Sequence, residues 1–242
     1  MKDTVTTGAP VRRTASASGA RRKAHAAPPA QMSAPSHITR RATPPLDPLA
    51  PDSEALAALI AAYPTLWLDL GTGDGRFVRR VAAQWPDALV IGVDACYANL
   101  RAELRRAPAN VAFIVADALT PAPDLAATLA GKVTRVTINF PWGSLLRGLL
   151  PEDGRLLAQL VALTAPGALV EARLNGGALA EVGWELTAGV QAARRGLTAS
   201  GFAMQAPTLL GVDELRDCPT TWARRLAFGR DPRAFLLRGV RG

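Results

Sequence analysis

The stretch LWLDLGTGDGR, residues 66–76, is an apolar run that meets three closely spaced glycines. A helix is expected to follow at once, over residues 75–84. A buried strand that ends in glycines and turns into a helix forms the ligand-binding corner of an α/β sheet, because glycine lets the backbone approach the ligand closely. We therefore expect the later apolar segments to add strands to the same sheet.

Two acidic residues indicate which ligand this corner holds. Asp69 precedes the first glycine by two residues, where a carboxylate would repel a pyrophosphate but suit an ammonium group. Asp94 ends the next apolar run, 88–93, at the place where such folds bind ribose hydroxyls. A ligand with a ribose and an amino acid but no phosphate is S-adenosylmethionine. The alternatives are a dinucleotide site, or an ordinary turn in which Asp69 is only a neighbour of the helix cap.

Composition limits the class of protein. With 242 residues, 49% of them apolar, the chain can form one domain with a substantial core. No apolar run reaches the ~18 residues of a membrane span, and the amino terminus has no apolar signal region, so we expect a cytoplasmic protein. Cys96 and Cys218 lack metal-ligand spacing, and both histidines, His25 and His37, precede the first periodic element. We expect no metal and no histidine-based catalysis.

The net charge of +8 is unevenly distributed. Formal charges are +6 for residues 1–50, −3 for residues 51–215 and +5 for residues 216–242. Because Lys and Arg neutralise phosphates, the basic ends indicate a nucleic acid as partner. An arginine-rich composition alone explains 25 Arg against 3 Lys, but it does not explain the clustering.

The chain divides at about residue 50. Residues 1–50 are rich in Ala, Pro, Ser, Thr and Arg and almost lack aliphatic periodicity, so we predict a disordered basic tail. A transit peptide or a flexible RNA-contacting arm is the alternative. Residues 51–242 form the predicted folded domain, which ends in a hairpin of 223–228 and 234–240. Further helices are expected at 54–60, 96–106, 152–163 and 190–200, and further strands at 110–116, 132–139 and 168–174.

The strand expected at 132–139 runs into FPWGSLL, residues 140–146. In an open parallel sheet the ligand lies at the carboxyl ends of the strands, so this loop should lie over the cofactor. An aromatic residue followed by Pro, Trp and Gly is unusual in a solvent-facing turn. It suggests a stiff platform for a flat substrate, with a Trp simply packed under the loop as the alternative.

Three motifs together resemble the aminoglycoside-resistance 16S rRNA (adenine-1408-N1) methyltransferases, which are class I S-adenosylmethionine-dependent enzymes. They are DLGTGDGR at 69–76, NFPWGSLL at 139–146 and TWARRLAFG at 221–229, and the likeness covers about residues 54–242. It implies a Rossmann-like, mostly parallel seven-stranded sheet with helices on both faces and a C-terminal antiparallel hairpin. It also implies methyl transfer to N1 of that adenine in 16S rRNA of the 30S ribosomal subunit, by a monomer, with aminoglycoside resistance as the result.

The resemblance also implies roles for individual residues. Trp142 and Trp222 would face each other across a gap of one base and clamp a flipped-out adenine, next to Phe140 and Pro141. The cofactor-binding residues would be Asp69, Gly71, Gly73, Asp94, Asp117, Ala118, Asn139 and Thr220. The RNA-binding candidates are basic residues of the expected hairpin: Arg224, Arg225, Arg230 and Arg233.

Other activities fit parts of the same pattern. The loop at 139–142 also resembles the Asn-Pro-Pro-aromatic loop of enzymes that methylate exocyclic amines, such as N6 of adenine. Its first three residues resemble tRNA guanine-N7 methyltransferases. Both alternatives leave Trp222 without a role. A third alternative is a non-catalytic RNA-binding relative with a decayed donor site.

Overall fold

The computed structural model describes residues 47, 52–100, 107–229 and 232–242. Apart from Asp47, the predicted tail therefore lies outside the described residues. Arg230 and residues 101–106 of the helix expected at 96–106 also lie outside them. No helix in the described part is both long and apolar enough to cross a membrane.

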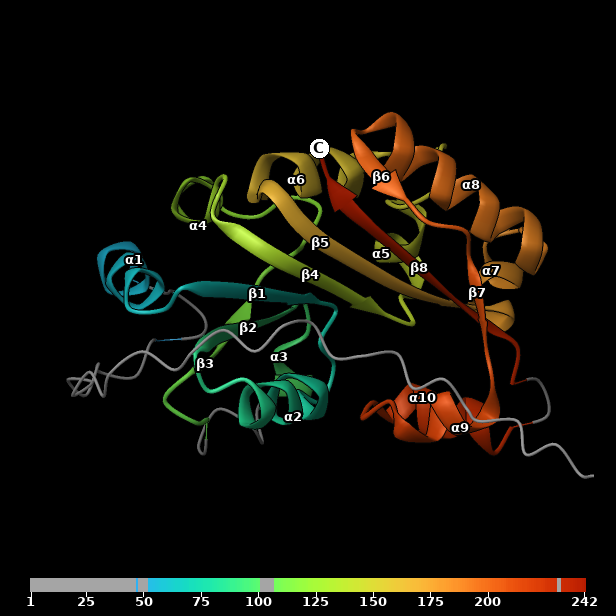
Figure 1. The fold of residues 1–242 in the computed structure, drawn as a ribbon, viewed down its shortest axis with the longest axis horizontal. Coiled ribbons are helices and arrows are strands. Elements are labelled where there is room, and N and C mark those ends of the chain that lie inside the picture. The colour runs from blue at the N-terminus through green and yellow to red at the C-terminus, as the bar shows by residue number, and fades with distance from the viewer. Residues whose placement is uncertain (1–46, 48–51, 101–106, 230–231) are drawn as a thin grey trace, which may run out of the picture. The chain divides into compact units, whose positions relative to one another are not determined.

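One twisted sheet forms the centre of the domain, with helices on both faces (Figure 1). Its strands are β1 (Thr65–Leu70), β2 (Ala88–Asp94), β3 (Val111–Val115), β4 (Val133–Asn139), β5 (Thr164–Asn175), β6 (Phe202–Met204), β7 (Thr208–Leu210) and β8 (Ala234–Arg241). The order is β3-β2-β1-β4-β5-β8-β6, with β1 to β5 parallel and β8 antiparallel to its neighbours. β6 and β7 pair with successive halves of β8, so the eight strands fill seven positions. The predicted fold class is confirmed.

β1 shows why the sheet is buried on both faces. Alternate side chains point to opposite faces of a strand. Leu66 and Leu68 accordingly enter the larger of two apolar clusters, whereas Trp67 enters the other, together with residues of β2 and α2. Asp69 follows Trp67 by two positions and so points to the same face. A carboxylate is thereby carried into the interior by an otherwise apolar strand.

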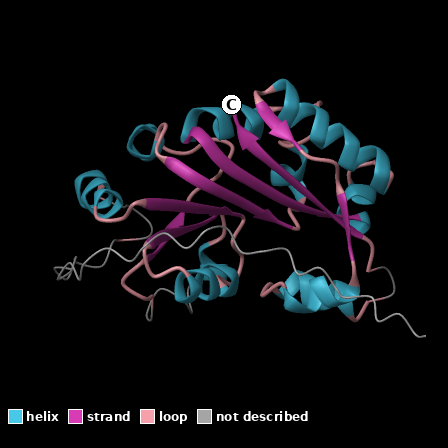
Figure 2. Ribbon diagram, viewed as in Figure 1, coloured by secondary structure: helices cyan, strands magenta, loops and turns pink. Residues whose placement is uncertain are grey.

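The helices divide between the two faces of the sheet, as Figures 1 and 2 show. They are α1 (Ser53–Ala61), α2 (Arg76–Gln84), α3 (Tyr97–Leu100), α4 (Pro123–Leu129), α5 (Gly143–Arg147), α6 (Arg155–Leu163), α7 (Gly176–Glu181), α8 (Leu186–Ala199), α9 (Val212–Asp217) and α10 (Thr221–Ala227). The first helix is capped by Asp52, because a side-chain oxygen of this residue accepts from the backbone N–H of Ala55 at 2.9 Å. In the view of Figure 1, α6 and α8 lie above the sheet, and α2, α9 and α10 lie below it.

The prediction that 223–228 forms a strand of the terminal hairpin is wrong. This segment lies in α10, and the antiparallel partners of β8 on that side are β6 and β7. The reason is periodicity. Ala223, Leu226 and Ala227 recur at helical spacing and pack in one apolar cluster with Phe140 and Leu215.

The position of β8 inside the sheet predicts which of its side chains support the fold. Leu237 is fully buried, whereas Val240 in the same strand is 37% exposed. Leu237→Ala should lower the free energy of unfolding by about 2–5 kcal/mol, because it removes buried methyl groups and leaves a cavity. Val240→Ala should cost less than half as much. Equal losses in urea denaturation would contradict this placement of β8.

Candidate functional site

A cavity of about 330 Å³ lies at the carboxyl ends of the parallel strands. Its volume is within the ~300–1,000 Å³ of small-molecule sites. The glycine turn after β1 and the end of β2 form one side, and the loop after β4 forms another. Most of the predicted site residues line it: Gly71, Gly73, Asp94, Asp117, Ala118, Asn139, Phe140, Pro141, Trp142 and Trp222.

The turn after β1 requires glycine at two positions. Gly71 and Gly73 have φ angles of 71° and 59°, which residues with a side chain rarely adopt. A Cβ atom on Gly71 would lie 2.5 Å from a methyl carbon of Leu145, so the loop after β4 packs directly on the bare backbone. The turn and this loop therefore form one continuous wall of the cavity.

Asp94 is a fixed acceptor at the end of β2. Its Oδ2 accepts from the backbone N–H of Gly73 at 2.8 Å, and its Oδ1 accepts from the N–H of Cys96 at 2.9 Å and from Nδ2 of Asn99 at 3.0 Å. A carboxylate has about four acceptor sites, so these three bonds leave about one for a ligand. The half-buried carboxylate can thus accept one further hydroxyl without reorienting.

Asp69 lies beneath the wall formed by the glycine turn and the loop after β4, and it does not line the cavity. It is 1% exposed, and its Oδ1 accepts from Oγ1 of Thr137 at 2.7 Å and from Nδ2 of Asn139 at 3.0 Å. Burial raises the pKa of Asp69 to about 6, because loss of hydration outweighs the hydrogen bonds and the charge of Arg173. We expected this carboxylate to meet the cofactor directly, but the structure places it one layer deeper.

Arg173 of β5 connects to the same carboxylate through Asn139. Its Nη1 donates to Oδ1 of Asn139 at 2.9 Å, which turns Nδ2 of that amide towards Asp69. The backbone carbonyl of Arg173 accepts from the N–H of Phe140 at 2.8 Å. Sequence reasoning missed this residue. The available signal was the pair Glu171 and Arg173, charged residues two apart in an otherwise apolar strand, which need partners when buried.

Phe140 sits in a strained backbone conformation at the start of the loop. Its φ angle is 53°, and it has the only positive φ among the described residues other than glycine. This conformation costs roughly 1–2 kcal/mol in a residue with a side chain. The ring is 2% exposed and packs against Leu215 and Ala223, so burial offsets the strain. The sharp turn directs the following residues, Pro141 and Trp142, along the cavity wall.

The structure brings Trp142 and Trp222 together, but without the gap that we expected. Their ring centroids lie 4.9 Å apart with an interplanar angle of 30°, so the two indoles stack on each other. A base between them would need two stacking contacts of about 3.5–4.0 Å each. The expectation of an open, base-sized gap is therefore wrong for this state of the molecule. Nε1 of Trp142 is buried and has no acceptor within the described part of the chain.

The segment that carries Trp222 is attached to the glycine turn. Oγ1 of Thr221 donates to Oδ2 of Asp74. Thr220 does not line the cavity, and its hydroxyl instead accepts from the N–H of Ala223 at 2.9 Å, which caps α10. Thr220 is thus a structural neighbour of the site in this geometry.

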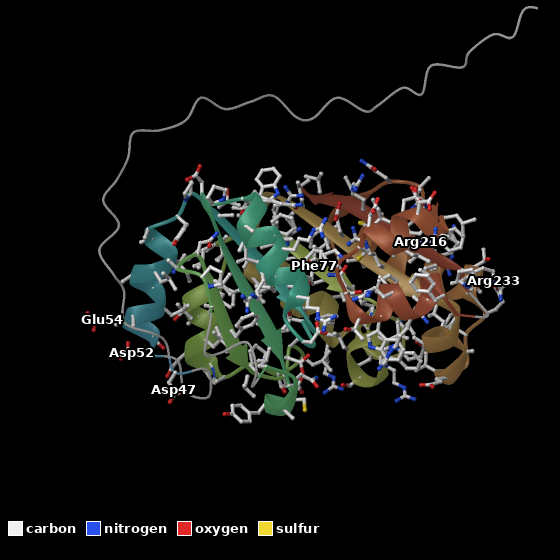
Figure 3. The ribbon with its side chains drawn as sticks, turned by 90° about the horizontal axis from the view of Figure 1, so that it is seen from below. Asp47, Asp52, Glu54, Phe77, Arg216 and Arg233 are labelled. Atoms are coloured by element: carbon white, nitrogen blue, oxygen red, sulfur yellow. The ribbon has the colours of Figure 1, made fainter. Side chains whose placement is uncertain are left out.

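The three predicted RNA-binding arginines that the structure describes, Arg224, Arg225 and Arg233, do not form one cluster. The guanidinium of Arg225 lies 5.0 Å from the ring of Trp222, beside the stacked indoles. Arg224 lines a different cleft, between α2 and α9. Arg233 is exposed just before β8 (Figure 3). Among the described residues, no group of three or more His, Cys, Asp and Glu side chains could hold a metal ion.

The groups around the cavity fit a ligand with an amino-acid end and a ribose. The bare backbone of Gly71 and Gly73 allows close approach, and Asp94 retains one acceptor. The unpaired indole N–H of Trp142 offers one further hydrogen-bond donor. Buried N–H groups of this kind normally have an acceptor in folded proteins.

The family model and the curated relatives that match more than two thirds of this chain agree on one family. The model of the NpmA family, 16S rRNA (adenine(1408)-N(1))-methyltransferase, matches residues 48–241. A relative of that description from Streptoalloteichus hindustanus is 31% identical over 189 residues, which cover 72% of this chain and 85% of the relative.

Solved structures agree with the sequence matches. A mutant of the 16S rRNA (adenine(1408)-N(1))-methyltransferase from Catenulisporales acidiphilia, with its cosubstrate SAM, has a TM-score of 0.67 and 27% identity, covering 78% of this chain and 91% of that one. The aminoglycoside resistance methyltransferase NpmB1 has a TM-score of 0.63 and 28% identity, covering 79% and 94%.

The raised pKa of Asp69 predicts a pH dependence of stability. The folded-state pKa of about 6 exceeds the ordinary value of 3.8, so between these values the native state binds more protons than the unfolded chain. The contribution is complete below pH 3.8 and is lost as the pH rises through about 6, by up to about 3 kcal/mol. Between pH 3.8 and about 6, the difference in free energy of unfolding between the wild type and Asp69→Asn should therefore shift by up to about 3 kcal/mol, to the disadvantage of the wild type. Parallel pH profiles of the two proteins would contradict the shift.

Proposed function

Because the chain belongs to the 16S rRNA (adenine(1408)-N(1))-methyltransferase family, we propose that its cavity holds S-adenosylmethionine and that Trp142 and Trp222 receive the target adenine. The enzyme transfers a methyl group to N1 of adenine 1408 in 16S rRNA, which confers aminoglycoside resistance. The observation that supports the site assignment best is the pair of indoles on the wall of the cavity. Trp142 lies in the loop after β4 and Trp222 in the first turn of α10, and both line the same cavity.

The donor would be held mainly by backbone groups and one carboxylate. The turn at Gly71 and Gly73 would receive its amino-acid end, and the free acceptor of Asp94 would bind a ribose hydroxyl. The carboxylate of Asp117 already accepts from the N–H of Leu119 at 2.9 Å and from Oγ1 of Thr120 at 3.1 Å. Its backbone and that of Ala118 are therefore better placed to meet the adenine edge than its side chain. Bound S-adenosylmethionine supplies a methyl group on a positively charged sulfur.

Asp69, Asn139 and Arg173 would position the loop over the donor. Asn139 lines the cavity while both ends of its amide are bonded, to Asp69 on one side and to Arg173 on the other. An amide fixed at both ends cannot rotate, so the adjoining strained turn at Phe140 keeps one geometry. These residues act on the chemistry through position, without transferring a proton.

The target atom requires position more than a strong base. Adenine N1 carries its own lone pair, so it can attack a methyl group directly once aligned and desolvated. The two tryptophans would supply alignment and exclude water. This agrees with a site whose described walls contain no histidine. Methylation of the exocyclic amine would require proton loss and leaves Trp222 without a role.

Entry of the base would replace one aromatic contact with two. An aromatic pair such as Trp142 and Trp222 is worth about 0.5–1.5 kcal/mol beyond its buried area. Stacking of a base on an aromatic face is worth about 1–3 kcal/mol for each contact. Two base contacts therefore exceed the indole pair that they displace and offset much of the few kcal/mol needed to flip the base. The closed pair would act as the resting state of the clamp.

The proposed substrate form is the assembled small ribosomal subunit, in the cytoplasm. We expect the enzyme to act as a monomer, because both indoles and the donor cavity belong to one chain. The decisive test is reverse transcription of small-subunit RNA from cells that express the protein. A methyl group on N1 blocks base pairing and stops the polymerase at adenine 1408, whereas a methyl group on N6 does not. Absence of this stop would favour the exocyclic-amine alternative or a non-catalytic relative.

Substitution of the two tryptophans tests the clamp. Trp142→Phe and Trp222→Phe should each retain part of the methylation, since a stacking face remains. Trp142→Ala and Trp222→Ala should each lose most of it, and the donor affinity of Trp222→Ala, measured by calorimetry, should be close to that of the wild type. Trp222→Ala should also have little effect on stability, because this side chain is 39% exposed. Full methylation by the double Ala variant would exclude the clamp.

Substitution of Asp94 tests the donor site. Asp94→Ala removes the free acceptor and the bond that fixes Gly73, so donor affinity should fall about 10–100-fold, as expected for a hydrogen bond to a charged group. Asp117→Asn should have a much smaller effect, because its carboxylate is bonded within its own turn. Calorimetry on both folded variants measures the difference. Wild-type affinity in folded Asp94→Ala would place the ribose elsewhere.

A further inference from the structure

A second cleft lies on the other side of the segment that carries Trp222. It has a volume of about 470 Å³ and is bounded by α2 on one side and by α9, α10 and the residues between them on the other. These elements lie below the sheet in Figure 1 and on the side that faces the viewer in Figure 3. The bond between Thr221 and Asp74 connects the two sides next to the donor cavity. Four arginines line this cleft: Arg76, Arg80, Arg216 and Arg224.

The charge of this cleft is only partly neutralised. Asp217 is the one acidic residue among the described residues that line it. Arg76 pairs with Asp74 at 3.3 Å, and Arg216 with Asp213 at 3.4 Å, but these pairs are exposed and such pairs are worth little in water. Within the described part of the chain, no ion pair is found for Arg80 or Arg224. An excess of guanidinium groups therefore faces the hollow.

The fold does not require these arginines where they are. Arg76 and Arg80 lie four apart on α2, on one exposed face, and like charges at this spacing destabilise a helix. Arg76 also lies in the first turn, where the helix dipole disfavours a cation. The buried face of α2 is formed by other residues, among them Phe77 and Val81. A polyanionic ligand would explain why Arg76 and Arg80 occupy these positions, although they lower the stability of the free protein.

The geometry of α10 relates this cleft to the target base. Residues two apart on a helix point to opposite sides, and they are separated by about 3 Å along the axis. Trp222 and Arg224 stand in this relation, so one side of the helix faces the donor cavity and the other faces the arginine cleft. Guanidinium groups bind phosphate oxygens in forked geometry. A strand whose base enters beside Trp222 would place a neighbouring phosphate near Arg224.

We propose that the cleft lined by Arg76, Arg80, Arg216 and Arg224 binds the phosphate backbone of the rRNA strand next to the target adenine. The proposal rests on the proposed function and adds α2 to the RNA-binding surface, which the sequence motifs restricted to the carboxy-terminal segment. The cleft makes no contact with the base itself. It contributes affinity and orientation and leaves the choice of base to the indoles.

The test uses two arginines that have no part in the proposed donor site. In Arg76→Gln/Arg80→Gln, affinity for 30S subunits should fall, and the slope of log affinity against log salt should decrease by about two, since about one unit is lost for each phosphate contact. Affinity for S-adenosylmethionine should match the wild type. Arg195→Gln is the matched control, because this exposed arginine of α8 lies on the other face of the sheet (Figure 1).

The outcomes separate this proposal from the proposed function. If wild-type protein methylates N1 of adenine 1408 and the double variant keeps the wild-type salt slope, the cleft does not bind RNA and the proposal fails alone. If Arg195→Gln, which removes one charge, changes the slope by about half as much as the double variant, which removes two, the effect is one of net charge, and the proposal also fails. If wild-type protein produces no stop in reverse transcription, the proposed function fails, whatever the arginine variants do.

Discussion

The structure depends on a carboxylate buried inside its sheet. Asp69 cannot lose its hydration without partners, and it obtains them from the neighbouring strand, through Thr137 and Asn139. Trp67 extends the chain of bonds on one side by donating to Thr137, and Arg173 extends it on the other by donating to Asn139. These hydrogen bonds fix β1, β4 and β5 relative to one another near their carboxyl ends, next to the donor site. The hydrophobic effect assembles this sheet, but the polar chain sets how its strand ends align.

Alignment at the strand ends decides how the two indoles meet. Trp142 follows a strained residue, Phe140, whose ring packs into the same apolar cluster as α10. Trp222 belongs to α10, which is attached to the glycine turn through Thr221 and Asp74. Each indole is therefore positioned by a contact outside the cavity. The site is therefore closed by its own aromatic side chains, and a base that enters between them replaces the stacking contact that holds them together.

Much of the fold could be predicted, because its signals are local. Apolar runs identified the parallel strands, including those expected at 88–93, 110–116, 132–139 and 168–174. The residues around the cavity followed from the rule that ligands lie at the carboxyl ends of parallel strands. Prediction failed where the decisive contact is distant in sequence. The burial of Asp69 beneath the glycine turn and the direct stacking of the tryptophans depend on tertiary neighbours that no local pattern encodes. The error at 223–228 is different, because the helical spacing of Ala223, Leu226 and Ala227 is present in the sequence.

The order of strands along the chain also has a consequence for synthesis. β8 is the last described strand in sequence, yet it lies between β5 and the β6–β7 pair, so it emerges from the ribosome after every strand it joins. Until then β5 has an open edge, and β6 and β7 have no partner in the sheet. Pairings of this range close slowly, and an open edge can pair with other chains. The nascent protein is therefore most exposed to misassembly before β8 emerges, and pairing of β8 joins β6 and β7 to the rest of the sheet.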